Sequence, residues 1–259
     1  MKITCLALAV AVLILISSNT FADSFTARVY TDPDGQSIPY QLLIPSGYDK
    51  AQSYPLVLSL HGAGERGAND TAQLPFVARH LATPGFQSRH PCFVIAPQCP
   101  ADQQWVDMGW GELSGIRPAQ PTPVMQQALK LLDQIATEFN IDRNRIYVAG
   151  VSMGGYASWD CITRYPERFA AGIVCCGGGD ENTVTAAVAQ VPVWVFHSDN
   201  DPTVPVVRAR IMVAAMKKMG GQPRYTEYSG LGHDIGDKAY GEALPWLLDQ
   251  RLDYRRALK

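Results

Sequence analysis

The sequence predicts an α/β fold in which a mainly parallel sheet carries helices on both faces and an antiparallel strand pair at its N-terminal edge. Three observations support this class. Residues 54–60 form a continuous apolar run, as expected for a strand buried on both faces. Segments typical of strands and of helices alternate after it. Before it, β-leaning runs at 25–30 and 40–44 flank the D-P-D-G turn signal at 32–35, which predicts a hairpin.

The alternation gives each expected element a place along the chain. Strands are predicted at 92–96, 145–149, 170–175, 193–196 and 225–228, and helices at 124–139, 153–164, 206–219 and 240–251. Strands joined through helices lie parallel in one sheet. Because no polar linker interrupts the pattern, we expect residues 23–259 to form a single domain.

The first residues have the features of a targeting segment. A lysine at position 2 precedes an apolar run at 6–16, and small residues surround position 22. This pattern predicts a secretory signal peptide over 1–22, cleaved after Ala22, and a secreted or periplasmic protein. The apolar run is about half of the roughly 20 residues that span a membrane. We therefore expect no membrane span after cleavage.

Composition narrows the classes of function. The chain has 259 residues, of which 47% are hydrophobic and 18% charged, and its formal net charge is −2. These values are typical of a globular protein with a sizeable core. No block of lysine or arginine stands out, which argues against a nucleic-acid partner or an anionic membrane surface. The oligomeric state stays open.

The cysteines do not predict a metal site. Five remain after the predicted cleavage, so at least one thiol is unpaired unless two chains pair. A predicted strand separates Cys92 from Cys99 and holds them too far apart for a disulfide. No C-x-x-C pair exists, so neither a zinc site nor a redox site is expected. The remaining three, Cys161, Cys175 and Cys176, fall in segments that we interpret as core, and the pairing stays open.

The run G-V-S-M-G at 150–154 is the strongest chemical signal. It lies between a predicted buried strand and a predicted helix that ends at a tyrosine–proline pair at 165–166. Strand, G-x-S-x-G turn and helix is the context of a nucleophile elbow, in which a strained turn exposes the serine hydroxyl. This predicts Ser152 as a nucleophile and the backbone N–H of Met153 as a donor to an oxyanion.

A glycine-rich stretch, H-G-A-G-E-R-G at 61–67, follows the apolar strand. Its backbone is able to turn N–H groups toward the same edge of the sheet, where a second oxyanion donor belongs. A phosphate-binding loop is the rival, but the spacing and lysine of that motif are missing. A tight turn without function is the other alternative. We interpret His61 as structural, because it precedes the turn.

The expected order after the serine is an acid and then a histidine. Only His233 follows a late strand, in a loop before the last helix, and it is the predicted base. Asp199 and Asp201 compete as the acid. Asp201 reaches farther from the strand end and precedes a proline-rich turn, which favours it, whereas Asp199 is expected to be a solvated loop acid.

Six motifs carry a family resemblance from about residue 28 to residue 250. In chain order they are L-H-G-A-G-E-R-G at 60–67, A-P-Q-C-P at 96–100, N-R-I-Y at 144–147, G-V-S-M-G-G at 150–155, C-G-G-G-D at 176–180 and G-L-G-H-D at 230–234. Together they resemble the α/β-hydrolase superfamily, in a branch of small secreted esterases often labelled "predicted peptidase". That branch is similar to the phospholipase/carboxylesterase, feruloyl esterase and polyhydroxybutyrate depolymerase groups.

The resemblance implies a role for each matching residue. It implies Ser152 as nucleophile, Asp201 as acid and His233 as base, with the backbone N–H groups of Ala63 and Met153 as the oxyanion hole. It also implies an α/β-hydrolase fold and no cofactor. Relatives often carry an aromatic residue shortly after the His-Asp pair, where this chain has I-G-D at 235–237.

Three classes of function follow from these roles. An ester hydrolase acting on small acyl, feruloyl or carbohydrate-linked esters leads, with a small-molecule or carbohydrate-linked ester as partner. A serine peptidase uses the same machinery, and a non-catalytic binding protein is the outsider, because every catalytic position is filled. Trp105, in the proline- and glycine-rich stretch 100–123, either stacks on a sugar or phenolic ring of the substrate or packs that loop onto the core.

Overall fold

The structure, a computed structural model, describes residues 24–253. The predicted signal peptide at 1–22 lies outside this range. Within it, no helix combines the length and the apolar character that crossing a membrane requires.

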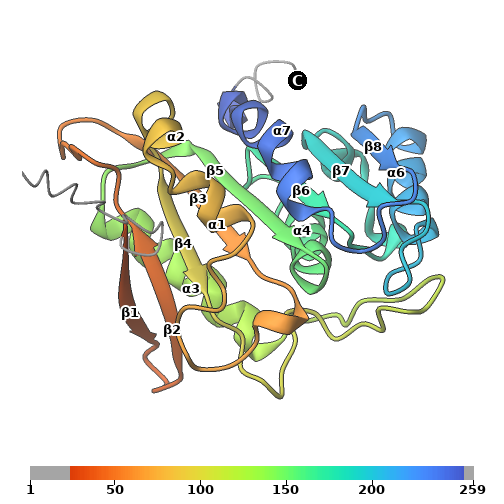
Figure 1. Cartoon of the computed structure of the whole chain (residues 1–259), viewed down its shortest axis with the longest axis horizontal. Coiled ribbons are helices and arrows are strands. Elements are labelled where there is room, and N and C mark those ends of the chain that lie inside the picture. The colour runs from red at the N-terminus through yellow and green to blue at the C-terminus, as the bar shows by residue number, and fades with distance from the viewer. Residues whose placement is uncertain (1–23, 254–259) are drawn as a thin grey trace, which may run out of the picture.

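One eight-stranded sheet runs through the molecule, in the order β1-β2-β4-β3-β5-β6-β7-β8 (Figure 1). β1 pairs with β2, and β2 with β4, in antiparallel fashion, and all later pairs are parallel. The strands are β1 (Phe25–Thr31), β2 (Ser37–Leu43), β3 (Tyr54–Leu60), β4 (Phe93–Pro97), β5 (Ile141–Val151), β6 (Ala171–Cys175), β7 (Val193–Ser198) and β8 (Arg224–Tyr228). The predicted class, a mainly parallel sheet with an antiparallel N-terminal edge, is confirmed.

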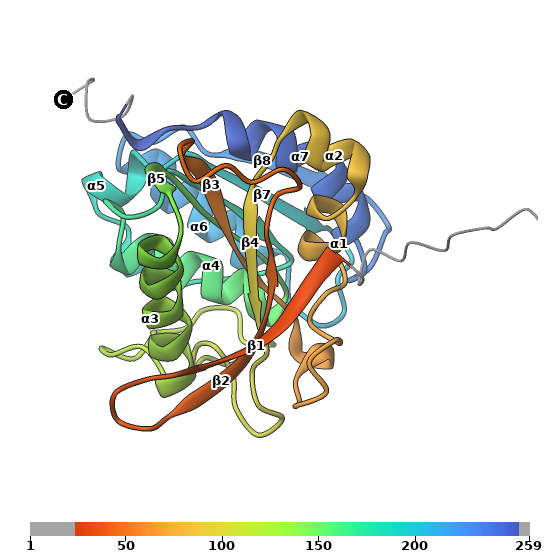
Figure 2. The same cartoon turned by 90° about the vertical axis from the view of Figure 1, so that its left-hand side faces the viewer.

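Helices cover both faces of this sheet, as Figure 2 shows from the side. The helices are α1 (Val77–Leu81), α2 (Pro84–Arg89), α3 (Pro123–Glu138), α4 (Met153–Arg164), α5 (Ala186–Ala189), α6 (Val207–Lys218) and α7 (Gly236–Asp249), with short 3-10 turns η2 (Ala63–Glu65) and η3 (Glu181–Thr183). Side chains of α3, α4, α5 and α6 pack on one face, and those of α1 and α7 pack on the other.

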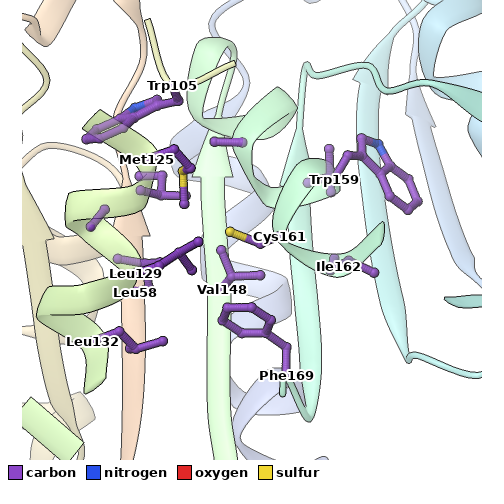
Figure 3. Close-up of a cluster of buried hydrophobic side chains, with 14 of the residues drawn as sticks. Leu58, Trp105, Met125, Leu129, Leu132, Val148, Trp159, Cys161, Ile162 and Phe169 are labelled. Carbon is purple, nitrogen blue, oxygen red and sulfur yellow. The ribbon is translucent and has the colours of Figure 1, made fainter. Parts of the chain in front are cut away.

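The larger core lies between the sheet and the helices α3 and α4. Leu58 of β3 and Val148 of β5 meet Leu129 of α3 and Ile162 of α4 there, all buried (Figure 3). β3 is buried on both faces over its whole length, as the apolar run predicts. These buried central strands hold the loops at their carboxyl ends in fixed positions.

Element boundaries deviate from the prediction where polar residues or turns obscure the pattern. β5 begins at Ile141 rather than at residue 145, because its first part pairs with Tyr54 across a register shift. α7 begins at Gly236 rather than at residue 240. The helices α1 and α2 were not predicted, since each spans only one or two turns.

All five cysteines of the described residues are buried and free. Cys92 and Cys99 flank β4, whose extended backbone separates them, as expected. The described part of the chain therefore holds five unpaired thiols in its core.

Candidate active site

Ser152 lies in the sharp turn between β5 and α4. Its backbone has φ 54° and ψ −117°, a strained conformation for a residue with a side chain. Gly150 and Gly154 allow this turn. A Cβ on Gly150 would lie 2.2 Å from the Gly154 carbonyl oxygen, and one on Gly154 would lie 1.9 Å from that of Leu60. The G-x-S-x-G spacing therefore reflects direct backbone packing of the turn against β3.

The structure brings together the three side chains that the sequence singles out. His233 Nε2 lies 2.9 Å from Ser152 Oγ, and His233 Nδ1 lies 2.7 Å from Asp201 Oδ2. Asp199 does not contact His233. It accepts hydrogen bonds from the Ser229 hydroxyl and the Gly230 N–H, and thereby holds the loop that carries His233.

Asp201 is fixed on every side by donors. The N–H groups of Thr203 and Val204 donate to Oδ1 at 2.8 and 2.9 Å. His197, a fully buried side chain, lies 3.3 Å from Oδ2 through Nε2, which is also 2.9 Å from the Val204 carbonyl oxygen. Burial alone would raise the pKa of Asp201, but the hydrogen bonds from His197, His233 and the two N–H groups lower it below its usual range. Asp201 is therefore ionised at neutral pH.

The environment of His233 favours its protonated form. Burial alone lowers the pKa of the imidazole, but the hydrogen bond to the Asp201 carboxylate outweighs it and raises the pKa above 6.5. The same hydrogen bond places the proton of the neutral ring on Nδ1. Nε2 is then the acceptor that faces the Ser152 hydroxyl.

His61 holds the glycine-rich loop from inside the protein. The Cys99 N–H donates to His61 Nε2 at 2.9 Å, so the ring proton lies on Nδ1, which is 2.6 Å from the Gly62 carbonyl oxygen. Burial lowers the pKa of His61 to about 4, so the ring stays neutral. The structural interpretation of this histidine is consistent with these contacts.

Ala63 and Met153 each begin a helical turn. Ala63 is the first residue of η2 and Met153 the first of α4. The first N–H groups of a helix have no partner within the helix and are available to an anion. Arg66 secures the Ala63 end, because its Nε donates to the Ala63 carbonyl oxygen at 2.9 Å.

Trp105 does not have access to a substrate, which overturns the stacking role. The side chain is fully buried, and its Nε1 donates to the His61 carbonyl oxygen at 3.1 Å. Its ring packs at the edge of the His61 ring with centroids 5.2 Å apart. Trp105 thus packs against the buried side of the glycine-rich loop and holds His61 in place. Trp110, from the same long connection, lines the pocket instead.

A pocket of about 300 Å³ lies beside Ser152 and His233. Its further lining residues are Gly62, Ala63, Gly64, Glu65, Phe76, Trp110, Val151, Thr203 and Asp234. Phe76 also covers Gly236, where an added Cβ would lie 2.6 Å from the phenyl ring. Phe76, from a segment far away in the sequence, thus supplies an aromatic ring beside the residues that follow the His-Asp pair.

Two acidic side chains, Glu65 and Asp234, line this pocket. Burial raises the pKa of Glu65, and the nearby Asp234 adds to the shift. Asp234, the second of these acids, is exposed.

Cys176 is the site residue that sequence reasoning missed. Its Sγ is fully buried, lies 3.2 Å from the His233 carbonyl oxygen, and forms a group with one donor atom each of Asp201 and His233, all within 4.8 Å of one another. Its position directly after β6 was the available signal, because the carboxyl ends of parallel strands share one edge of the sheet.

A parallel sheet, a strained serine turn after β5 and an acid and a histidine on later loops define an α/β-hydrolase. The model of the phospholipase/carboxylesterase family matches residues 43–246. The chain therefore belongs to this family.

Known proteins agree with this assignment. A solved thermostable esterase is 40% identical with a TM-score of 0.82, over 89% of this chain and 64% of that one. A probable SOBER1-like carboxylesterase of Arabidopsis thaliana is 23% identical, over 74% of this chain and 77% of the relative. A bifunctional acetylxylan esterase/xylanase of Neocallimastix patriciarum is 36% identical over 78 residues, which are 30% of this chain and 11% of the relative. The family and these relatives support ester hydrolysis as the chemistry of the site.

Proposed function

We propose that this protein is a serine esterase that hydrolyses carboxylic esters through an acyl-enzyme. One observation carries the proposal: the hydrogen-bonded chain from Asp201 through His233 ends on the Ser152 hydroxyl, at the wall of a pocket. Asp201 is held in the ionised state that its role requires, and the neutral form of His233 accepts the Ser152 proton at Nε2.

In the first half of the reaction, His233 Nε2 takes the proton of Ser152 as Oγ attacks the ester carbonyl carbon. The ionised Asp201 stabilises the imidazolium that forms, and its hydrogen bond to Nδ1 keeps the ring oriented. His233 then donates the proton to the leaving alcohol, which departs and leaves the acyl group on Ser152.

The N–H groups of Ala63 and Met153 are proposed as the oxyanion hole. They begin η2 and α4, so neither is needed within its own helical turn. A single donor of this kind stabilises the transition state by about 3 kcal/mol. Arg66 and His61 restrain the peptide groups on either side of Ala63, which keeps this donor in place before the substrate arrives.

Water completes the cycle by the reverse path. His233 removes a proton from water, the hydroxide attacks the acyl carbon, and the returned proton restores the Ser152 hydroxyl as the acid leaves. Only residues of the chain are needed for these steps.

The substrates are proposed to be esters of small acyl groups, including carbohydrate-linked ones. A volume of about 300 Å³ is at the lower limit of ligand pockets. Its apolar walls, Phe76 and Trp110, suit a short acyl chain or a ring. The 36% identical segment of an acetylxylan esterase/xylanase supports the carbohydrate-linked class. Export from the cell remains part of the proposal, and it depends on the pattern of residues 1–22.

The test is a substrate panel with the mature protein and its Ser152→Ala variant. We expect hydrolysis of p-nitrophenyl acetate and covalent labelling by a fluorophosphonate, and the loss of both in the variant. Anilide hydrolysis faster than ester hydrolysis would replace the esterase with a peptidase. Absence of both turnover and labelling in the folded wild type would refute the serine mechanism.

A further inference from the structure

Cys176 is a nucleophilic side chain that the proposed mechanism does not use, although it touches the machinery. Cys176 follows β6, Asp201 follows β7, and His233 follows β8, so three adjacent strands deliver the three side chains to one point. Their donor atoms, a sulfur, a carboxylate oxygen and a ring nitrogen, lie within 4.8 Å of one another.

This donor set has a specific chemistry. Thiolate and imidazole favour soft or borderline cations such as Zn²⁺, whereas Mg²⁺ and Ca²⁺ prefer oxygen ligands alone. Three protein ligands around Zn²⁺ leave one position for water. We propose that Cys176, Asp201 and His233 form an inhibitory site for a thiophilic divalent cation, for which Zn²⁺ is the representative ion; this inference rests on the proposed function.

The present spacing is close to that of a filled site. Bonds of about 2.3 Å to sulfur and about 2.0 Å to nitrogen or oxygen put tetrahedral ligands roughly 3.5 Å apart. The donor atoms, which lie up to 4.8 Å apart, therefore need to close by roughly 1.3 Å at most. If Nδ1 is the ligand, Asp201 Oδ2 and His233 Nδ1 instead need to open from 2.7 Å by roughly 0.8 Å, and the hydrogen bond between them is lost. The side chains of Cys176 and Asp201 are buried and that of His233 is 27% exposed, so the cation has to enter past the His233 ring.

Binding blocks the proposed base without filling the pocket. The cation takes a lone pair from Cys176, whose thiol proton is released to solvent, and a lone pair from one nitrogen of His233. If the cation binds Nδ1, the single proton of the neutral ring has to lie on Nε2. If the cation binds Nε2, the lone pair of Nε2 is occupied by the metal bond. In both cases Nε2 no longer accepts the proton of Ser152. We expect kcat to fall while KM changes little.

The chain offers a matched control for the cysteine. Cys161 is another buried free thiol, and it lies within α4, away from this cluster. Cys176→Ser keeps the size of the side chain and removes the soft ligand, and Cys161→Ser makes the same change elsewhere. Circular dichroism establishes that both variants are folded, and each is compared with its own uninhibited rate. Cys176→Ala is the second variant if the serine form does not fold.

The experiment is inhibition of p-nitrophenyl acetate hydrolysis by ZnCl₂ after removal of chelators, with MgCl₂ as the hard-cation comparison. We expect Zn²⁺ to inhibit the wild type and Cys161→Ser reversibly, with recovery on adding EDTA, and Mg²⁺ to have no effect. Half-inhibition of Cys176→Ser should require a Zn²⁺ concentration about tenfold higher than in the wild type, or more. Equal inhibition of Cys176→Ser and the wild type, or equal inhibition by Mg²⁺, overturns the site.

A binding measurement separates this inference from the proposed function. Cd²⁺ is titrated into the wild type, Ser152→Ala and Cys176→Ser, and thiolate-to-cadmium charge-transfer absorption is recorded in the ultraviolet. The wild type and Ser152→Ala should give the band with one equivalent of metal, and Cys176→Ser should lack it. An inactive wild type that gives the band refutes the esterase alone, whereas an active wild type without the band refutes the metal site alone.

Discussion

The Nδ1 atom of His61 lies 2.6 Å from the carbonyl oxygen of Gly62. This carbonyl shares a peptide plane with the N–H of Ala63, and in a trans peptide the two groups point in opposite directions. By holding the oxygen toward the interior, His61 directs the Ala63 N–H outward, to the side where Ala63 lines the pocket. A neutral, buried histidine without access to substrate is thereby coupled to the proposed oxyanion hole.

Replacing His61 is expected to slow the chemical step. In His61→Ala the Gly62–Ala63 peptide loses its restraint, and a misplaced donor costs about tenfold to a hundredfold in kcat, with little change in KM. Steady-state kinetics with p-nitrophenyl acetate measures both constants. His90→Ala, a change of the same kind at the end of α2, is the control. An unchanged kcat in folded His61→Ala would show that the Gly62–Ala63 peptide keeps its orientation without His61.

The pH dependence should reflect the raised pKa of His233. The base works only when neutral, so activity is lost as the pH falls below the pKa of His233, which lies above 6.5 because of Asp201. The rising limb of kcat/KM against pH should therefore have its midpoint above 6.5. In Asp201→Asn we expect the midpoint to move down and kcat to fall by about 10⁴-fold. Asp199→Asn should keep the wild-type midpoint, and a wild-type midpoint at or below 6.5 contradicts the electrostatic argument.

The serine turn should be intolerant of a single added methyl group. In Gly154→Ala the new Cβ would lie 1.9 Å from the Leu60 carbonyl oxygen, which belongs to a buried strand and has little room to move. We expect a loss of about 3 kcal/mol or more in the free energy of unfolding, measured with urea. Gly241→Ala, within α7 and with open space around it, should raise that free energy by up to about 1 kcal/mol. Equal stabilities of the two variants would contradict the packing of the turn.

Phe76 should limit the size of the acyl group. It lines the pocket, covers Gly236, and has a φ of 63° that few side chains adopt. In Phe76→Ala we expect kcat/KM for p-nitrophenyl butyrate, relative to the acetate, to rise by about tenfold. Phe86→Ala, in α2 and outside the pocket lining, is the control. If the butyrate-to-acetate ratio of kcat/KM is the same in Phe76→Ala and the wild type, another residue of the pocket limits the size of the acyl group.

The sequence predicts most of the framework because local signals mark it. β3 and α4 have the predicted bounds, because β3 is a continuous apolar run that ends at the glycine-rich stretch and α4 ends at the tyrosine–proline pair at 165–166. The three side chains of the hydrogen-bonded chain were also predicted by motif and order. The longer distance of Asp201 from the strand end favours it over Asp199 as the acid. The structure agrees, because Asp201 contacts His233.

The rest depends on contacts between distant segments. Trp105 and Trp110 look alike in the sequence, yet Trp105 is buried against His61 and Trp110 lines the pocket. Phe76 reaches Gly236 only through the packing of α1 against α7. In the sequence, Cys176 cannot be told from a cysteine of the core. Its place beside Asp201 and His233 follows only from the convergence of three strand ends in the fold. No periodicity within one segment carries this information.

The hydrogen-bonded side chains and the apolar walls of the site come from separate segments of the chain. The hydrogen-bonded chain comes from the turn after β5 and the loops after β7 and β8, whereas the apolar walls come from the segment before α1 and from the long connection between β4 and α3. Exchange of Phe76 and of the part of the connection around Trp110 with the residues of a relative should transfer its acyl preference. Cys99 and Trp105 of the same connection have to be kept, because they hold His61 and the glycine-rich loop. The fold is thus modular: new selectivities are able to evolve, or to be engineered, without rebuilding the catalytic loops.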